Sequence, residues 1–152
     1  MRHYLLHLCT LVVMVGCTDQ QPSPSGASQA AALPPASPLA GTWALHIEGL
    51  NHATTDISVQ FSDVPADSCI SGDWKRLVVE SPHKPDDSVF PASQPLSYTF
   101  DGHDLTIGRN EMCDAYLHLI GSLKNSAVEG EYVSMGLGGA QHLGVFTLHR
   151  RQ

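Results

Sequence analysis

The sequence predicts an all-β fold, an eight-stranded antiparallel up-and-down barrel, with a β-sandwich as the alternative. Two observations indicate this fold. Eight short segments after residue 40 are rich in alternating apolar and polar residues, and turns that contain glycine separate them. No segment of this region repeats its apolar residues with helical spacing. Many short strands at regular spacing are typical of antiparallel barrels, which close on themselves and so remove their edges.

The first three strands are predicted at residues 41–48, 55–61 and 73–80. The first two alternate strictly, so one face of each is apolar and the other faces solvent. Their apolar faces contain Trp43, Leu45, Ile47, Ile57, Val59 and Phe61. The third strand has an apolar centre, and its pattern does not decide which residues face inward.

The fourth and fifth strands are predicted to form a hairpin from residues 96–100 and 104–108. These segments flank Asp101-Gly102-His103. An Asp-Gly step between two alternating runs favours a tight turn, because glycine adopts the backbone angles that such turns need.

Three further strands complete the set, at residues 116–123, 127–134 and 143–151. In the first of these, one face carries Leu117, Leu119, Gly121 and Leu123. Across the whole barrel the candidate interior residues are bulky: Trp43, Phe61, Tyr98, Phe100, Leu117 and Phe146. An eight-stranded barrel is just wide enough to be filled by side chains or to hold one small ligand, and this bulk favours the filled version.

The chain is predicted to divide into three parts, residues 1–16, 17–38 and 39–152. The apolar run at its start is shorter than the roughly 20 residues that a membrane-spanning helix needs, and it has the length of a signal-peptide core. Met14-Val15-Gly16-Cys17 follows and resembles the lipobox of bacterial lipoproteins. A plain signal peptide with an incidental cysteine is the alternative.

The lipobox resemblance implies cleavage before Cys17, lipidation of its thiol and acylation, for example by palmitate, of the new amino terminus. Several acyl chains together make a stable membrane anchor. Thr18 in the next position implies export to the outer membrane rather than retention at the inner one. The expected location is therefore the bacterial cell envelope, with the protein attached by lipid.

Residues 17–38 are predicted to be a disordered tether. The segment contains half of the chain's ten prolines, and its other residues are mainly Ser, Ala and Gln. Such a composition cannot bury enough apolar surface to offset the entropy of ordering. The 114 residues that follow, 39–152, suffice for one domain with a core of its own.

Four cysteines are present, and two of them, Cys9 and Cys17, belong to the signal and the lipid anchor. Cys69 and Cys113 remain, and two cysteines in an oxidising compartment are most simply a disulfide. A reactive pair and a pair of metal thiolates are the alternatives. Neither cysteine has a CxxC spacing or an obvious histidine beside it.

The net charge of −7 and the absence of any basic run argue against nucleic acid as a partner. They also disfavour direct electrostatic binding to anionic lipid. An acidic domain favours a basic partner instead.

Gly41-Thr42-Trp43, at the start of the first strand, and Arg150 and Arg151, at the end of the last, resemble the pattern of lipocalins and the wider calycin group. The resemblance implies that these two strands are neighbours and that an arginine lies over the tryptophan ring to close the base of the barrel, here Arg150 over Trp43. The physical basis is a cation–π contact. Avidins begin with a similar strand, but their biotin site is lined by several tryptophans, and this chain has two.

No motif of catalysis is present. His46, His118 and His149 are predicted on the solvent face of their strands, and His46 and His149 are expected near one another. A weak zinc or copper site is possible there in principle, but exposed surface histidines are the preferred interpretation, so no metal ligand is assigned. The Gly-rich run 136–144 is followed by a strand, not by the helix that a phosphate-binding loop needs, and is interpreted as a flexible hairpin loop. Glu129 and Glu131 are interpreted as solvated carboxylates.

The sequence therefore predicts a non-enzymatic binding module without a cofactor, whose partner is an envelope protein or a cell-wall component. An inhibitor or immunity role belongs to this class. A carrier of a small apolar ligand inside the barrel is the alternative. Two loops are expected to make the contact, 83–87 and 136–142. The residues assigned to it are His83, Asp86, Asp87, Gly138, Gly139 and His142.

Overall fold

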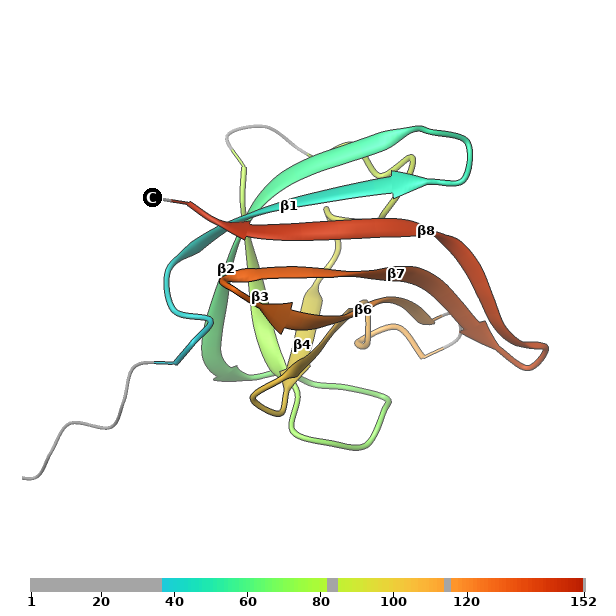
Figure 1. Ribbon diagram of the computed structural model, residues 1–152. Helices are drawn as coiled ribbons and strands as arrows, with labels where there is room; N and C mark the ends of the chain where they lie inside the picture. The colour runs from blue at the N-terminus through green and yellow to red at the C-terminus, as the bar shows by residue number, and fades with distance from the viewer. Residues whose placement is uncertain (1–36, 82–84, 114–115, 152) are drawn as a thin grey trace, which may run out of the picture. The chain divides into compact units, whose positions relative to one another are not determined.

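A computed structural model describes residues 37–81, 85–113 and 116–151. These residues form a closed barrel in which each strand pairs antiparallel with the next and the eighth returns to the first (Figure 1). The strands are β1 (Thr42–Gly49), β2 (Thr54–Pro65), β3 (Lys75–Glu80), β4 (Leu96–Phe100), β5 (Asp104–Gly108), β6 (Tyr116–Lys124), β7 (Ala127–Gly136) and β8 (Gly139–Arg150). The barrel prediction is thus confirmed over the sandwich alternative.

The alternation of β1 explains how it joins the barrel. Trp43, Leu45 and Ile47 are buried, and the residues between them are partly exposed. Leu45 lies opposite Ile57 of β2 and Leu148 of β8, so apolar residues of three neighbouring strands meet on one face. Because a slip of one residue would move this whole set to the outside, burial fixes the register.

The predicted hairpin is confirmed as β4 and β5. Gly102 has a positive φ of 104°, which glycine adopts without steric cost. The Asp101 carboxylate accepts hydrogen bonds from the backbone N–H groups of Asp104 at 2.8 Å and His103 at 2.9 Å. These two bonds hold the pKa of Asp101 below its usual value, since they favour the charged carboxylate.

The region interpreted as a flexible hairpin loop, 136–144, is instead strand and tight turn. β7 runs to Gly136 and β8 begins at Gly139, with Met135 opposite Ala140. A positive φ of 97° at Gly139 allows the chain to reverse within a few residues. The glycines that suggested a loop therefore serve the turn, and the strands continue through the residues on either side.

The barrel interior is filled by side chains. All six predicted interior residues belong to its core: Trp43, Tyr98 and Phe146 are buried, and Phe61, Phe100 and Leu117 are partly buried and pack against them. Phe61 meets both Trp43 and Tyr98 edge to face, with ring centroids 6.0 and 4.8 Å apart. In the described ranges, no helix is long and apolar enough to cross a membrane.

The base of the barrel, where β1 begins and β8 ends, is closed by three groups. Leu39 is buried, and its carbonyl accepts a hydrogen bond of 3.0 Å from Trp43 Nε1. The Arg150 guanidinium carbon lies 5.1 Å from the centre of the Trp43 ring, and the same guanidinium donates to the Pro38 carbonyl. Trp43 is completely buried, with Arg150 over its ring.

The opposite end, which we call the rim, is closed by the connection that precedes β4. Phe90 and Ala92 of this connection are buried in the core. Phe90 meets Tyr132 of β7 edge to face at 5.5 Å, and the Tyr132 hydroxyl donates to the Val89 carbonyl at 3.0 Å. Chain segments thus cover both ends of the filled barrel.

Candidate functional site

The rim carries most of the residues predicted to bind a partner. Asp86 and Asp87 lie in the connection that closes this end, and both are exposed. Asp86 accepts a hydrogen bond from the Ser88 backbone N–H at 2.9 Å, and Asp87 accepts one from the Ser93 N–H at 2.8 Å. The two carboxylates therefore brace the connection that holds Phe90 in place. His83 lies outside the described residues, as do Cys17, the signal segment and the tether up to residue 36.

An apolar pocket of about 270 Å³ lies at the rim, and we call it the rim pocket. Its lining comes from four separate segments: Gly49, Leu50, Asn51, Ser88, Val89, Tyr132 and Leu143. Leu50 is 66% exposed, although its backbone N–H is fixed by a 2.9 Å hydrogen bond to the Leu143 carbonyl. An apolar side chain held in place yet left in water is available for a contact.

Next to the rim pocket, the β7–β8 hairpin extends past its neighbours, and residues 133–142 are called the arm. In Figure 1 this hairpin, orange to red, runs out beyond the end of β1. β8 pairs with β1 only from Gly144 onward, whereas it pairs with β7 from Gly139 onward. At the tip, Leu137 is fully exposed between glycines.

The two predicted contact loops approach one another at the rim pocket. Ser88 follows Asp87, Leu143 follows His142, and both Ser88 and Leu143 line the pocket. Gly138 and Gly139 lie farther out, at the tip of the arm. Leu50 and Val89 were not predicted as contact residues. They lie in two connections far apart in the chain, and only the fold brings them together.

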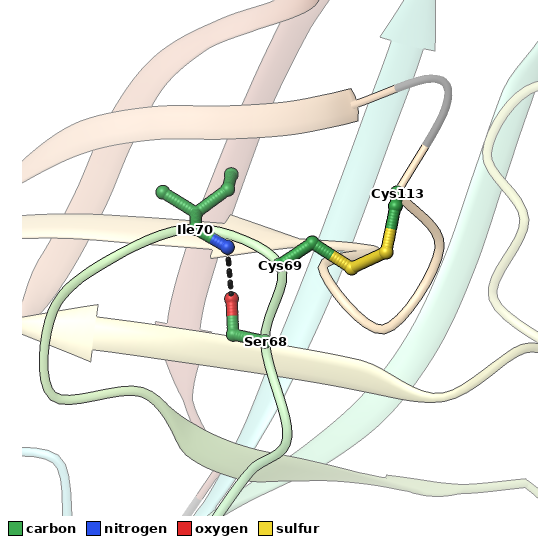
Figure 2. Close-up of a disulfide and its surroundings, with 4 residues drawn as sticks. All are labelled: Ser68, Cys69, Ile70 and Cys113. Carbon is green, nitrogen blue, oxygen red and sulfur yellow. Dashed lines mark hydrogen bonds between the residues drawn. A yellow bond between two sulfur atoms is a disulfide. The ribbon is translucent and has the colours of Figure 1, made fainter.

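The connection between β2 and β3, residues 66–74, lies on the outside of the barrel wall, and we call it the lid. A disulfide joins Cys69 of the lid to Cys113, in the connection between β5 and β6, with their Cα atoms 5.4 Å apart (Figure 2). The Cys69 N–H also donates to the Asn110 carbonyl at 3.0 Å, and the Ser68 hydroxyl accepts from the Ile70 N–H at 3.0 Å. The predicted disulfide is present, and it fastens the lid to the wall.

His118, predicted to face solvent, is instead buried beneath the lid, with 4% of its surface exposed. The Trp74 ring stacks over the His118 ring with a centroid separation of 6.1 Å. His118 Nε2 donates a hydrogen bond to Asn110 Oδ1 at 2.9 Å. The alternation did place His118 on the outer face, but the lid covers that face. Burial lowers the pKa of His118, because its charged form would lose its hydration.

His46 and His149 line one surface groove of about 410 Å³, together with Asp56 and Glu80. His46 lies opposite Thr147, so the two histidines are offset by two positions along β8. His46 donates to Asp56 at 2.8 Å. Within 37–81, 85–113 and 116–151, no group of three His, Cys, Asp or Glu side chains is arranged to hold a metal ion.

Comparison with known proteins gives a limited result. No protein-family model matches the chain, and no curated protein matches it. Among solved structures, a redesigned β-barrel is similar, with 13% sequence identity over 76% of this chain and 93% of that chain and a TM-score of 0.43.

Proposed function

We propose that this protein is a non-catalytic binding module of the bacterial cell envelope that recognises an envelope protein or a cell-wall component through its rim. The observation that carries the proposal is the filled barrel closed at both ends. A ligand inside would have to displace buried aromatic side chains, whereas the rim offers an open pocket and a protruding arm. Binding at the surface is the simpler use of this fold.

The anchor belongs to the same proposal. A lipidated Cys17 followed by some twenty residues of Pro-rich tether, at roughly 3 Å per residue, gives a reach of about 60 Å. The chain enters the barrel at the base, before β1, and the rim lies at the other end of β1. Such an arrangement suits a domain that must reach something large.

The charge of the chain supports a basic partner. With a net charge of −7, long-range attraction accelerates association with a positively charged surface, and salt screens this attraction. An inhibitor or immunity role, in which the module covers the site of a secreted hydrolase, is one form of this function.

A pull-down with the tagged full-length protein, extracted from envelopes in mild detergent at low and high salt, tests the proposal. We expect a protein or glycan to be recovered, more at low salt, and to be lost on Leu137→Asp at the tip of the arm. Val64→Asp is the matched control, because Val64 is also an exposed apolar residue but lies on β2 toward the base. Recovery of a lipid or other small molecule alone would favour the carrier function instead.

A further inference from the structure

We propose that the arm is the docking edge for an extended, basic polypeptide segment, which adds as a strand beside residues 139–142 and inserts one apolar side chain into the rim pocket. The inference rests on the proposed function and names the class of its partner.

The first observation is an unpaired strand edge. From Gly139 to His142, β8 has β7 as its one strand partner among the residues that the structure describes, because β1 ends at Gly49 opposite Gly144 and the next residue, Leu143, is held by the Leu50 N–H. Residues 139–142 are exposed. The N–H and C=O groups on the open side of such a strand are a template for another extended chain.

The second observation is the composition of this edge. Residues 139–142 are Gly, Ala, Gln and His, without proline, lysine, arginine or a carboxylate. Proteins usually protect an exposed edge with charge, proline or a bulge. The one irregularity of this ladder is at Leu143, which is skipped between Gly144, opposite Tyr132, and His142, opposite Val133; the arm beyond it keeps regular pairing.

The third observation is the position of the rim pocket, where the open edge of β8 meets the barrel. A strand added beside β8 would continue the line of β1, and it would pass the rim pocket at Leu50 and Leu143. Small-molecule sites commonly measure about 300–1,000 Å³. At about 270 Å³, with Leu50, Val89 and Leu143 in its lining, the pocket is suited to a single apolar side chain of a bound peptide.

Charge decides between a foreign segment and a second copy of this chain. Glu48 and Glu131 lie opposite Val145 on either side, on the outer face just below the arm. They favour lysine or arginine in the added strand. Two copies placed edge to edge would each bring a net charge of −7, so their pairing is opposed by repulsion.

The test uses a phage-displayed library of random linear dodecapeptides, selected on the full-length protein in detergent. We expect the recovered peptides to alternate apolar residues and to contain Lys or Arg. Synthetic copies are then N-methylated on alternate backbone amides, in two sets that differ by one position. Methylation of the set that faces β8 should lower the affinity at least tenfold, and methylation of the other set should change it little. Leu143→Asp and Gln141→Pro should weaken binding by a similar factor, and Val64→Asp should not.

Circular dichroism and a thermal melt check that the two variants stay folded, and the N-methyl scan on the wild-type protein does not depend on them. Equal tolerance of methylation at both sets of positions would overturn the inference, as would unchanged binding to both variants. A wild-type dimer in sedimentation that Gln141→Pro dissociates would also overturn it, in favour of a second copy. If the pull-down partner persists in the arm variants, the proposed function stands with another surface, and this inference fails alone.

Discussion

The outer wall of the barrel has two parts that differ in what covers them. Over β4, β5 and β6, the outward residues Ser97, Gly108 and His118 are all buried, and Trp74 of the lid stacks over His118. Over β7 and β8, the outward residues Glu131 and Val145 are exposed, and beyond them the arm has an open edge. Among the described residues, the chain therefore covers one side of the wall itself and leaves the other side exposed.

Loss of the disulfide should have the largest effect on stability, because it loosens the cover of the wall. Cys69 and Cys113 are 44 residues apart, and closing a loop of that length stabilises by about 4 kcal/mol in the chain-entropy model. We expect Cys113→Ser to lower the free energy of unfolding by about this amount, as measured by urea denaturation. It should also expose Trp74 and shift its fluorescence, because the lid is no longer fastened.

Reduction of the wild-type protein is the control for that experiment. A reductant should reproduce the loss in the wild type and add nothing in Cys113→Ser. An unchanged unfolding midpoint after reduction would show that hydrogen bonds such as Cys69 N–H to Asn110 O hold the lid without the covalent link.

A methyl group added under the lid should have the next largest effect. A Cβ at Gly108 would lie 2.5 Å from His118 Cδ2 and 2.6 Å from Asn110 Oδ1, too close for either to remain in place. We expect Gly108→Ala to cost about 1–3 kcal/mol of unfolding free energy, typical of overpacking. Gly136→Ala on the arm is the matched control, since nothing lies within 4 Å of a Cβ there.

Equal losses for these two glycine variants would contradict the difference between the covered and open walls. Intrinsic strand propensity alone would make both substitutions mildly favourable, because glycine weakens a strand interior. The sign of the change in unfolding free energy for Gly108→Ala therefore distinguishes overpacking from strand propensity.

The sequence predicted the strands well because burial on one face imposes an alternation that can be counted. That alternation states which side of the wall a residue faces, and His118 does face outward. It does not state whether another segment lies over that side. The cover depends on Trp74 and on a disulfide across 44 residues, and neither leaves a local pattern at residue 118.

The rim was only partly predictable for related reasons. Asp86, Asp87 and His142 were expected at a binding surface, and they adjoin the rim pocket. Leu50 and Val89 come from two connections and Leu143 from β8, all far apart in the chain, so no short stretch of sequence contains the pocket. The arm was interpreted as a loop because glycine is common in both loops and tight hairpin turns, and pairing with a neighbour is what separates the two.

The pH dependence of stability should give a smaller effect, specific to the covered wall. Because burial lowers the pKa of His118 in the folded protein, the unfolded chain takes up a proton first as the pH falls. The contribution of this residue is complete above the unfolded pKa of about 6.5 and is lost below it, by at most about 1.4 kcal/mol per pH unit. Urea unfolding between pH 7.5 and 5.5 measures this slope, and His118→Gln should reduce it.

Substitution on the open side should change stability least and binding most. Leu137 is fully exposed at the tip of the arm, so Leu137→Asp should alter the free energy of unfolding by no more than about 0.5 kcal/mol. The new carboxylate should nevertheless prevent an apolar contact at the tip, so recovery of the partner in the pull-down should fall. A thermal melt beside the pull-down measures both quantities on one preparation. A large loss of stability would mean that Leu137 packs within the protein. The surface that contacts the partner would then have to lie elsewhere on the open wall, for example at Val145.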